Sequence, residues 1–451
     1  MSSPGLRARC TILRGVRFAV SNALPRSRGS QVSGGGSMAQ NVMVVGAGVI
    51  GLATAYFLSK SGLSVTVVDQ GQPGDGCSYG NMGWVCPSLS EPLPSPGIVA
   101  SSLNGMFDGT SPLYIKPREL LHIWPWLLSF WRYSSPQQYT AGLEANLWLN
   151  QRTLELYDQW GANGVSFEMH SDGLLYAFRD ADAWNKKVKS VSRVADYGFP
   201  VPEPLSNDAL LDLEPDLSPG VVGGILLPKE RHVRADTLVR GLVRHLLAAG
   251  VDFRTATMID TIDTNAHSVQ ALRAAGSRLQ ADAYVLAAGA WTGRLARSIG
   301  LRLPIIAGKG YSLTMTEPNV KVRHPLYLGD TKVAVSPYNG ALRVGGTMEF
   351  SGFNTRIDPK RVDSIRAASR MYFRVPPAGQ TTEIWAGKRP MTPDGLPVIG
   401  RAAKYGNLFI ASGHGSDGIF MAPATASLLC EIMLDHPLPP QAQAFRPDRF
   451  S

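Results

Sequence analysis

The clearest pattern in the chain is the alternation of short apolar runs with segments of helical spacing. Residues 41–45 are apolar and rich in β-branched side chains, a glycine-rich turn follows at 46–51, and 52–60 continues as a helix. A second apolar run at 63–68 ends at Asp69. We therefore expect a strand, a tight turn, a helix and a second strand over 41–69, as at the start of a parallel sheet with crossover helices.

The same pattern resumes after a long interruption. Residues 233–250 carry apolar side chains at helical spacing, and 251–253 continue as a strand. The apolar run 281–288 leads into Gly289, as a buried parallel strand does when it ends in a tight turn. The first fold therefore resumes near 225, and the segment before it belongs to another part of the molecule.

A second group of strands is predicted between 300 and 380. Residues 310–316, 333–337 and 341–347 alternate or are uniformly apolar, and Gly and Pro separate them. A chain of 451 residues is too long for one ordinary core. We expect an α/β protein with a Rossmann-type dinucleotide-binding domain and an interleaved α+β substrate domain built on a mixed or antiparallel sheet.

The glycines at 46–51 indicate a dinucleotide site. Gly46 permits the tight turn, Gly48 lets the backbone approach a pyrophosphate, and Gly51 allows the helix to pack closely on its strand. The pyrophosphate then lies on the N–H groups of a helix that begins near Val49. Asp69, 21 residues after Gly48, is placed to accept hydrogen bonds from the ribose hydroxyls, which argues against a 2′-phosphate.

The segment from about 90 to 225 is proline-rich at its start and contains an aromatic run at 124–131. Such a run most often lies in a protein core. A contact with a membrane surface and a lid over the substrate are the alternatives.

Basic residues are concentrated at the N-terminus. The formal net charge is +9, but six arginines and no acid lie within 1–37, so the remainder carries +3. This argues against a nucleic-acid partner, which requires a basic surface on the folded part. The four cysteines form neither a CxxC pair nor a cluster with His, so we expect no disulfide framework and no metal. No apolar run is long enough to span a bilayer.

Two interpretations of 1–37 stay open. The segment is rich in Arg, contains Ser and lacks acids, as organellar transit peptides do. It also contains a linker-like run at 33–37, and Met38 stands just before the first strand as an alternative start. We expect a cytoplasmic protein, peripheral on the inner membrane if it contacts one, or a mitochondrial protein if the extension is a transit peptide.

The densest chemistry lies near the C-terminus. The segment 385–400 carries Arg389, and a strand at 407–412 leads into a glycine-rich turn at 413–418 and a helix over about 421–434. Backbone N–H groups at the start of such a helix stabilise the negative charge of a reduced, electron-accepting ring. The small residues of the turn leave room for a planar ring.

Together these motifs resemble those of bacterial D-amino acid dehydrogenases, which belong to the wider D-amino acid and glycine oxidase family of FAD enzymes. The resemblance covers 38–440 and is carried by 46–51, 309–314, 343–346, 389–395 and 413–415. It implies an FAD-binding domain assembled from 38–90, 225–300 and 385–440, a substrate domain from 91–224 and 301–384, and a separate N-terminal extension at 1–37.

The resemblance also implies roles for particular residues. Arg389 matches an arginine that holds the substrate carboxylate, and Tyr311 is our candidate for a tyrosine that assists beside the ring. A guanidinium suits a carboxylate because its fork holds both oxygens at once. Trp84 departs from the polar residue expected in the family, which leaves the exact substrate open. The residues expected to bind FAD, without a covalent bond, are Gly46, Gly48, Val49, Ile50, Gly51, Asp69, Gln70, Asn81, Gly83, Ala288, Gly289, Gly413, His414, Gly415 and Gly418.

The function implied is FAD-dependent oxidative deamination of a small D-amino acid. A hydride leaves Cα for flavin N5, water converts the imino acid into a 2-oxo acid and ammonia, and the electrons pass to a quinone or another acceptor. The alternatives are an oxidase that uses O₂, an enzyme of the same fold for glycine, sarcosine or D-hydroxyproline, and a non-catalytic flavin-binding subunit of a complex. We expect at most peripheral membrane contact.

Overall fold

The glycine turn at 46–51 joins a short strand to a helix, as the apolar pattern predicts. The computed structural model describes residues 40–103, 106–108 and 111–450, so the predicted extension at 1–37 and the alternative start at Met38 lie outside the described residues. β1 (Asn41–Val45) runs into α1 (Val49–Lys60), and β2 (Ser64–Val68) follows. Local sequence therefore decides this part of the fold.

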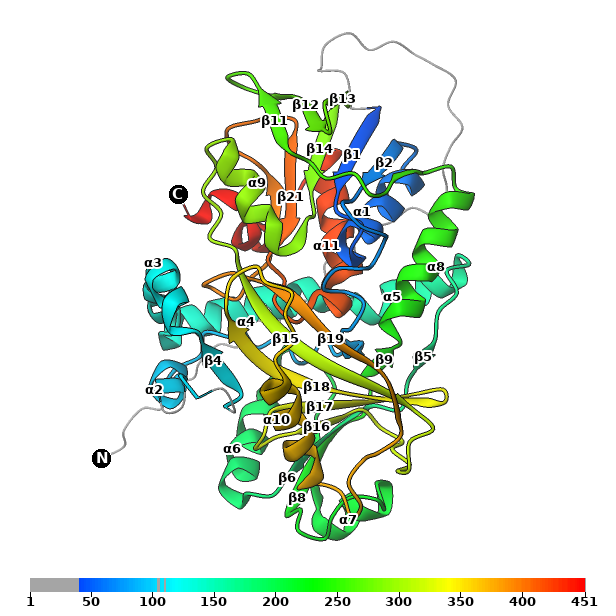
Figure 1. Cartoon of the computed structure of the whole chain (residues 1–451), viewed down its shortest axis with the longest axis vertical. Helices are drawn as coiled ribbons and strands as arrows, with labels where there is room; N and C mark the ends of the chain where they lie inside the picture. Colours follow the sequence, from blue (N-terminus) through cyan, green and yellow to red (C-terminus); the bar gives the residue numbers. More distant parts are fainter. Residues whose placement is uncertain (1–39, 104–105, 109–110, 451) are drawn as a thin grey trace, which may run out of the picture. The chain divides into compact units, whose positions relative to one another are not determined.

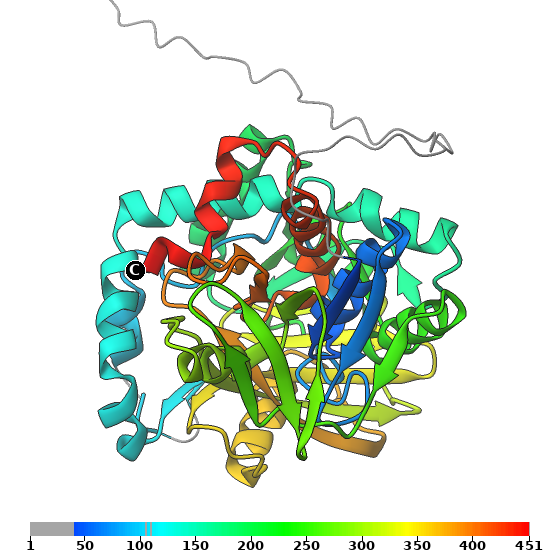
Figure 2. The same ribbon diagram turned by 90° about the horizontal axis from the view of Figure 1, so that it is seen from above.

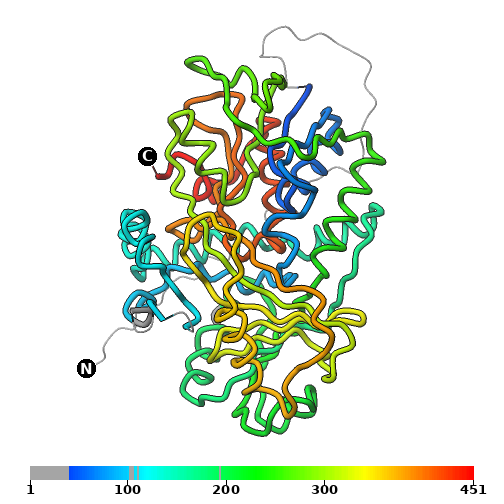
Figure 3. Tube along the Cα trace, viewed as in Figure 1, coloured from blue at the N-terminus to red at the C-terminus, as the bar shows by residue number. Residues whose placement is uncertain are grey.

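Six strands form the first sheet, in the order β10–β2–β1–β14–β21–β20. β10 (Asp252–Arg254), β14 (Ala283–Leu286) and β21 (Leu408–Ser412) pair in parallel with their neighbours, and β20 (Val398–Arg401) is antiparallel to β21. Segments from the start, middle and end of the chain thus meet in one sheet, as the colours of the tube in Figure 3 show. The predicted resumption of the first fold after a long insertion is confirmed.

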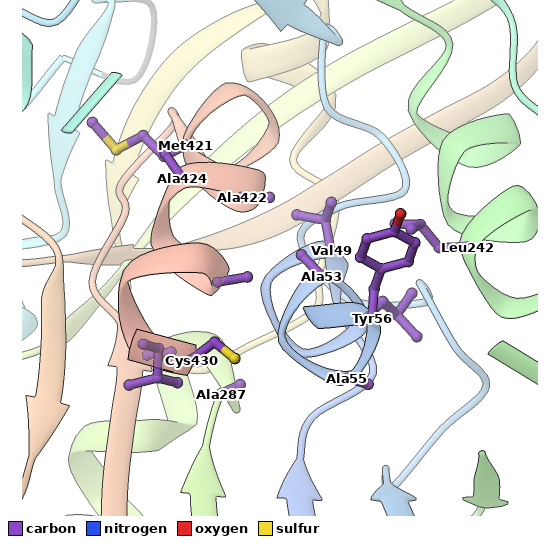
Figure 4. Packing of buried hydrophobic residues seen from close by; sticks show 14 of the residues in the cluster. Val49, Ala53, Ala55, Tyr56, Leu242, Ala287, Met421, Ala422, Ala424 and Cys430 are labelled. Carbon is purple, nitrogen blue, oxygen red and sulfur yellow. The ribbon is translucent and has the colours of Figure 1, made fainter. Parts of the chain in front are cut away.

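Three helices cover one face of this sheet. α1, α8 (Ala235–Ala248) and α11 (Gly418–Met433) pack on the face where Val42 and Val44 are buried. Figure 4 shows α1 beside α11, with Ala53 and Ala422 on the facing sides of the two helices. Both alanines are fully buried, and such small side chains let two helix axes approach closely. α11 begins three residues before the predicted start near 421.

An antiparallel meander covers the opposite face. It consists of β11 (Thr261–Thr264), β12 (Val269–Ala274) and β13 (Ser277–Leu279), and it packs with α9 (Thr292–Ser298). Met43 and Val45 point to this side, because successive side chains of a strand alternate between the two faces. The view from above shows the green meander on the opposite side from α11 (Figure 2). The first sheet is therefore buried on both faces.

The second sheet follows the path β19–β15–β18–β17–β16–β6–β8–β7, and β4 pairs with β18 (Figure 1). Only β16 with β6 and β18 with β4 are parallel, so the sheet is mixed, and the predicted fold class is confirmed. The bounds are β4 (Leu113–Ile115), β6 (Leu174–Phe178), β7 (Glu203–Ser206), β8 (Gly223–Leu227), β15 (Ile306–Thr316), β16 (Leu326–Leu328), β17 (Val333–Tyr338), β18 (Ala341–Phe350) and β19 (Gln380–Met391).

The remaining elements lie outside these two sheets and the layers already described. β19 crosses the expected domain boundary at 385 and lies wholly in the second sheet. The division of the chain into an FAD domain and a substrate domain stays a prediction. The other elements are β3 (Trp84–Val85), β5 (Met169–His170) and β9 (Arg231–Val233), which form a small sheet, the helices α2 (Ile98–Leu103), α3 (Pro117–Tyr133), α4 (Pro136–Asn150), α5 (Thr153–Ala162), α6 (Ala181–Val191), α7 (Asn207–Leu213) and α10 (Pro359–Arg370), and short 3₁₀ helices.

The aromatic run at 124–131 lies on α3, and the structure corrects its interpretation as core. Trp126 is buried, whereas Trp124 is 58% and Trp131 61% exposed. A helix turns through 100° per residue, so neighbouring aromatic side chains leave it in different directions. Only one side of the run is therefore internal.

Candidate active site

Two cavities adjoin beside the carboxyl ends of the parallel strands. The first, about 590 Å³, is lined by the last residues of β1, β2 and β21 and by the segments that follow β1, β2 and β14. The second, about 560 Å³, lies against the second sheet, α3 and the start of α11. Cys77 and Asn81 line both cavities, so these two residues mark the junction. Ligands of open α/β sheets bind at this edge.

The glycine turn gives the first cavity its narrow end. Gly46 has φ +112°, and a Cβ there would lie 2.4 Å from the carbonyl oxygen of Ala287. A Cβ at Gly51 would lie 1.8 Å from the oxygen of Gly46, so neither position admits a side chain without a shift of backbone. The first N–H groups of α1 have no acceptor within the helix, and Gly48, Val49 and Ile50 line the cavity at this point. This arrangement fits a pyrophosphate.

Asp69 lines the same cavity at the end of β2. Its two carboxylate oxygens accept hydrogen bonds from the N–H groups of Ala47 (2.7 Å) and Gly71 (2.8 Å). The side chain therefore ties the glycine turn to the segment after β2. A second residue, Ser78, supports α1 in a similar way, because its Oγ accepts a hydrogen bond from Val49 N at 2.9 Å.

Most residues that the sequence proposes for cofactor binding lie in the lining of the first cavity, although their role in binding stays a prediction. Gly51, Gly83 and Gly413 are not in the lining. They have packing reasons to be glycine, since a Cβ would lie 1.8 Å from Val233 O at Gly83 and 2.7 Å from the Thr392 side chain at Gly413. The residues that do line the cavity are Gly46, Gly48, Val49, Ile50, Asp69, Gln70, Asn81, Ala288, Gly289, His414, Gly415 and Gly418.

The turn before α11 closes the other end of the first cavity. Gly415 N donates to Pro390 O at 2.8 Å, which fixes the turn against β19. Burial lowers the pKa of His414 to about 3, so the ring is neutral, and its Nε2 lies 2.9 Å from Thr425 Oγ1. Its Nδ1 is buried without a hydrogen-bond partner in the structure.

Sequence reasoning missed several residues of this cavity. Lys388, Trp291 and Arg294 all contribute to its wall, and the ammonium of Lys388 lies 5.2 Å from the centre of the Trp291 ring. Burial, and then the charge of Lys309, lower the pKa of Lys388. Side chains alternate between the two faces of a strand, so Lys388 must face away from its neighbour Arg389 on β19. This alternation is the sequence signal that could have identified Lys388.

Arg389 enters the second cavity from β19. Its Nη1 donates to Thr347 O at 2.7 Å, and a Cβ at Gly310 would lie 2.2 Å from its Nη2, so that glycine makes room for the guanidinium. Burial lowers the pKa of Arg389, yet the side chain is only half-buried in accessible area because part of it faces the cavity. Among the described residues, no acid lies within ion-pair distance of it. Asp394, the alternative partner, pairs instead with Arg449 at 2.7 Å.

The walls of the second cavity are mainly apolar and aromatic. Burial raises the pKa of the Tyr327 hydroxyl to about 12, and Trp84 donates from Nε1 to Ser336 Oγ at 2.9 Å. Trp84 thus lies in the wall of the second cavity. Aromatic side chains of the lining are Trp84, Trp126, Phe130, Tyr176, Tyr327, Trp385 and Phe420.

The structure does not bring Tyr311 into either cavity. Tyr311 is 2% exposed, and its hydroxyl donates to Glu349 Oε2 at 2.5 Å. Burial, and then the bond to Glu349, raise its pKa. Arg343 is engaged as well, since its Nη1 donates to the carbonyl oxygens of Tyr79 (3.1 Å) and Asn81 (2.8 Å). Arg343 thus supports the segment at the junction, and Tyr176 and Tyr327 are the tyrosines in the lining of the second cavity.

Among the described residues, no group of three His, Cys, Asp or Glu side chains is arranged to hold a metal ion. No helix within 40–103, 106–108 and 111–450 has the length and apolar character of a membrane span.

Comparison with solved structures identifies the same fold in two amine-oxidising enzymes. Glycine oxidase from Geobacillus kaustophilus superposes with a TM-score of 0.70 at 21% identity, covering 91% of this chain and 99% of that chain. L-Proline dehydrogenase from P. horikoshii gives a TM-score of 0.73 at 15% identity, covering 92% and 98%. At these identities the likeness extends to the fold alone.

Sequence comparison goes further. A curated relative, the D-amino acid dehydrogenase of Bradyrhizobium diazoefficiens, is 32% identical over 423 residues, which cover 91% of this chain and 99% of the relative. The model of the FAD dependent oxidoreductase family matches residues 41–432. These residues include both cavities and every strand of both sheets. The protein therefore belongs to the FAD dependent oxidoreductase family and is an FAD-dependent oxidoreductase.

Proposed function

We propose that the protein oxidises D-amino acids, with Arg389 holding the substrate carboxylate in the second cavity. The observation that carries the proposal is this guanidinium, which lines the cavity close to the junction and pairs with no acid among the described residues. A buried cation without a paired anion is costly, so the site favours an anionic ligand. The configuration at Cα rests on the 32% identity with the D-amino acid dehydrogenase.

FAD supplies the hydride acceptor when it is bound in the first cavity. The N–H groups at the start of α1 hold the pyrophosphate, and Asp69 accepts from the ribose while it keeps the turn in place. The start of α11 and Lys388 would stabilise negative charge on a ring bound there. The cofactor is held without a covalent bond. Position and electrostatics, rather than acid–base chemistry on the ring, are the contribution of the protein.

The second cavity changes the expectation of a small substrate. Besides Arg389 its wall is dominated by aromatic and aliphatic side chains, and its volume of about 560 Å³ exceeds the needs of alanine or glycine. We infer that a larger apolar side chain, such as that of phenylalanine or methionine, occupies this space. The imino acid leaves the cavity and is hydrolysed to the 2-oxo acid and ammonia.

A comparison of three compounds tests the proposal. D-Phenylalanine, L-phenylalanine and 2-phenylethylamine share the ring and the amine but differ in configuration or lack the carboxylate. Reduction of an artificial dye by the FAD-loaded enzyme is expected with D-phenylalanine, at least 100-fold slower with the amine, and not with the L-isomer. Equal rates for D-phenylalanine and 2-phenylethylamine would remove the role of Arg389. Preference for glycine, sarcosine or D-hydroxyproline would assign the enzyme to another substrate of the same fold.

The electrons are proposed to pass to a quinone or another non-oxygen acceptor. One observation supports a membrane-soluble acceptor: α3 lines the second cavity with Trp126, Leu127 and Phe130, while its other side carries exposed apolar residues. These are Leu121 (77%), Trp124 (58%), Leu128 (42%) and Trp131 (61%), which we call the α3 stripe. Their spacing places them along one side of the helix.

The charges around the α3 stripe fit an anionic bilayer. Lys116, Arg118 and Arg132 are exposed at the two ends of α3, and Glu119 is the one acid of the helix. Helices of this kind lie in the membrane interface with their apolar side inserted. Co-sedimentation with anionic vesicles is therefore expected, and Trp124→Ser/Trp131→Ser should abolish it. The matched control Val201→Ser/Leu247→Ser removes two exposed apolar residues elsewhere and should bind as the wild type does.

Hydrogen peroxide formation separates the oxidase from the dehydrogenase. Under air, the FAD-loaded enzyme with D-phenylalanine is expected to form little peroxide compared with its rate of dye reduction. Peroxide in amounts equal to the substrate consumed would assign O₂ as the acceptor and leave the amino-acid chemistry unchanged.

A further inference from the structure

Asp417 is the residue directly before α11, and it lies on the substrate side of that turn. Gly415 and Gly418 line the first cavity, whereas Ser416 and Asp417 line the second. The hydrogen bond from Gly415 N to Pro390 O holds this turn beside the residue that follows Arg389. One wall of the second cavity therefore presents a guanidinium and a carboxylate that come from different elements, β19 and the turn before α11.

The carboxylate of Asp417 has no structural task in the helix that it precedes. Asp417 occupies the N-cap position of α11, but its side chain accepts no hydrogen bond from the helix backbone. The cap bond to Met421 N, 3.0 Å, uses the main-chain oxygen of Asp417. The side chain accepts one hydrogen bond, from Ser416 Oγ at 2.9 Å, and no ion pair with it forms among the described residues. An ordinary capping role is thereby excluded.

Charge complementarity indicates what Asp417 meets. An amino acid in water is a zwitterion, so a site that holds its carboxylate must also receive an ammonium group. Glu91, the other acid of the second cavity, already pairs with Lys187 at 2.8 Å. Asp417 is therefore the carboxylate available to a cationic amine, and Arg389, whose charge acts on Asp417, is a cation available to the anionic end.

We propose that Asp417 binds the ammonium group of the substrate and accepts one of its protons before the hydride leaves. This inference rests on the proposed function. The carboxylate takes H⁺ from nitrogen, the nitrogen lone pair forms the C=N bond as the Cα–H pair leaves as hydride, and FAD is the oxidant that receives it. The product is an iminium carboxylate, and Asp417 later releases its proton to water.

The surroundings of Asp417 suit this role. Burial raises its pKa to about 6, while the bond from Ser416 and the charge of Arg389 oppose the shift. The neighbouring ionisable groups are Arg389, Cys77, Cys86, Tyr176, Tyr327, Glu91, Lys332 and His414. Burial keeps the Cys77 thiol and the Tyr327 hydroxyl protonated, and lowers the pKa of His414 to about 3. Asp417 therefore changes charge near pH 6 and is ionised at neutral pH.

The test is the pH profile of kcat/KM for the FAD-loaded enzyme with D-phenylalanine. Wild type is expected to lose activity on the acid side around pH 6. Asp417→Asn, which keeps the shape of the side chain, should lower kcat/KM at pH 7 by about 100-fold. The remaining kcat/KM of Asp417→Asn should rise tenfold per pH unit, because this variant oxidises only substrate molecules whose amine is already neutral in solution. Asp417→Glu should restore the acid limb and most of the rate.

Two further measurements separate this role from a structural one. 3-Phenylpropanoate, the amine-free form of the substrate, is expected to perturb the visible spectrum of bound FAD when it enters the site. Asp417→Asn should bind it as tightly as wild type or more so, whereas Arg389→Ala should weaken binding at least tenfold. Glu91→Gln, the control at the other acid, should keep the acid limb of the profile. FAD content should stay near one per chain in Asp417→Asn and Asp417→Glu.

Each outcome decides between the inference and the function on which it rests. If wild type oxidises no D-amino acid, the proposed function fails. If wild type is active and Asp417→Asn keeps both rate and profile, only the role of Asp417 fails. The role of Asp417 also fails if the acid limb disappears in Glu91→Gln. It fails likewise if Asp417→Asn weakens the binding of 3-phenylpropanoate as much as Arg389→Ala does. If Asp417→Asn does not fold, the pH profile of Asp417→Glu decides. An acid limb at the wild-type pH, together with less than a tenth of the wild-type kcat/KM, would contradict the role of Asp417.

Discussion

Lys388 and Arg389 are neighbours on β19, yet their side chains line different cavities. Successive side chains of a strand point to opposite faces, so one strand reaches both sides of the junction. Lys388 lies near Trp291 in the first cavity, and Arg389 lies beside Thr347 O in the second. The strand thereby fixes the distance between a group directed at the cofactor and a group directed at the substrate.

Replacing Arg389 should reduce turnover without loss of FAD. Arg389→Ala leaves the carboxylate of the substrate in an apolar cavity, and we expect a cost of about 3–5 kcal/mol in kcat/KM for D-phenylalanine. Arg389→Lys keeps the charge but loses the forked guanidinium, so its kcat/KM should lie between those of wild type and Arg389→Ala. Steady-state kinetics with an artificial acceptor measure both. Arg366→Ala, which removes an exposed arginine paired with Asp363, is the control. Full activity in Arg389→Ala would place the carboxylate elsewhere.

Asp69→Ala should weaken retention of FAD. The variant removes the acceptor for Ala47 N and Gly71 N together with the charge directed at the ribose. We expect a loss of about 1.5–3 kcal/mol in FAD binding, and little change in kcat once FAD is saturating. Equilibrium dialysis against FAD measures the loss. Asp252→Ala, an exposed acid paired with Arg254, should leave the affinity unchanged. An unaltered affinity in Asp69→Ala would contradict the orientation given to the cofactor.

The cofactor should be released by acid. Cys77 lines both cavities and Cys86 lines the second, so a thioether with the ring is the alternative. Burial raises the pKa of Cys77 to about 11, which keeps it a thiol rather than a reactive thiolate. After precipitation with trichloroacetic acid, yellow FAD is expected in the supernatant. Flavin fluorescence that stays with the washed pellet, and disappears in Cys77→Ser, would establish a covalent bond instead.

Glu230 should make the folded state less stable as pH rises from about 4.5 to about 7. Glu230 is 4% exposed, and burial raises its pKa to about 7, although bonds from Ser88 oppose the shift. Within this window the folded chain holds a proton that the unfolded chain has released, so the free energy of unfolding falls with pH and levels off above it. The full difference is about 3 kcal/mol.

Glu230→Gln tests this linkage because it cannot ionise. The midpoint of thermal unfolding of the variant, compared with wild type, should improve as pH rises from 4.5 to 7 and then stay constant. Glu203→Gln changes an exposed glutamate on β7 and should follow wild type at every pH. A constant difference between Glu230→Gln and wild type over the whole range would mean that Glu230 is not protonated in the fold.

Local sequence predicts the first sheet and the glycine turns because their geometry is decided within a few residues. Gly46 adopts a φ of +112°, and a Cβ at Gly51 would meet the carbonyl oxygen of Gly46, so both requirements arise within one turn of the chain. The sequence of its segment also identifies Arg389 as a candidate. The structure adds that, among the described residues, no acid lies within ion-pair distance of Arg389.

Residues whose role depends on distant partners escape sequence reasoning. Tyr311 and Tyr327 both lie on strands of the second sheet, and only the register of that sheet directs Tyr311 to Glu349 and Tyr327 into the cavity. The run at 124–131 has the composition of core, yet α3 exposes half of it because no further element of the described part of the chain covers that side. Pairings between strands and the covering of helices are tertiary properties, which composition and spacing do not specify.

The central claim is that D-amino acids reduce the bound FAD directly. Its most direct test is an anaerobic titration of the FAD-loaded enzyme with D-phenylalanine, without a nicotinamide cofactor, followed by the visible absorbance of the flavin. We predict that the absorbance near the flavin maximum bleaches completely with one equivalent of substrate, and that L-phenylalanine and 2-phenylethylamine leave it unchanged over the same time. An oxidised spectrum that persists with D-phenylalanine, D-methionine and D-alanine alike would contradict the account.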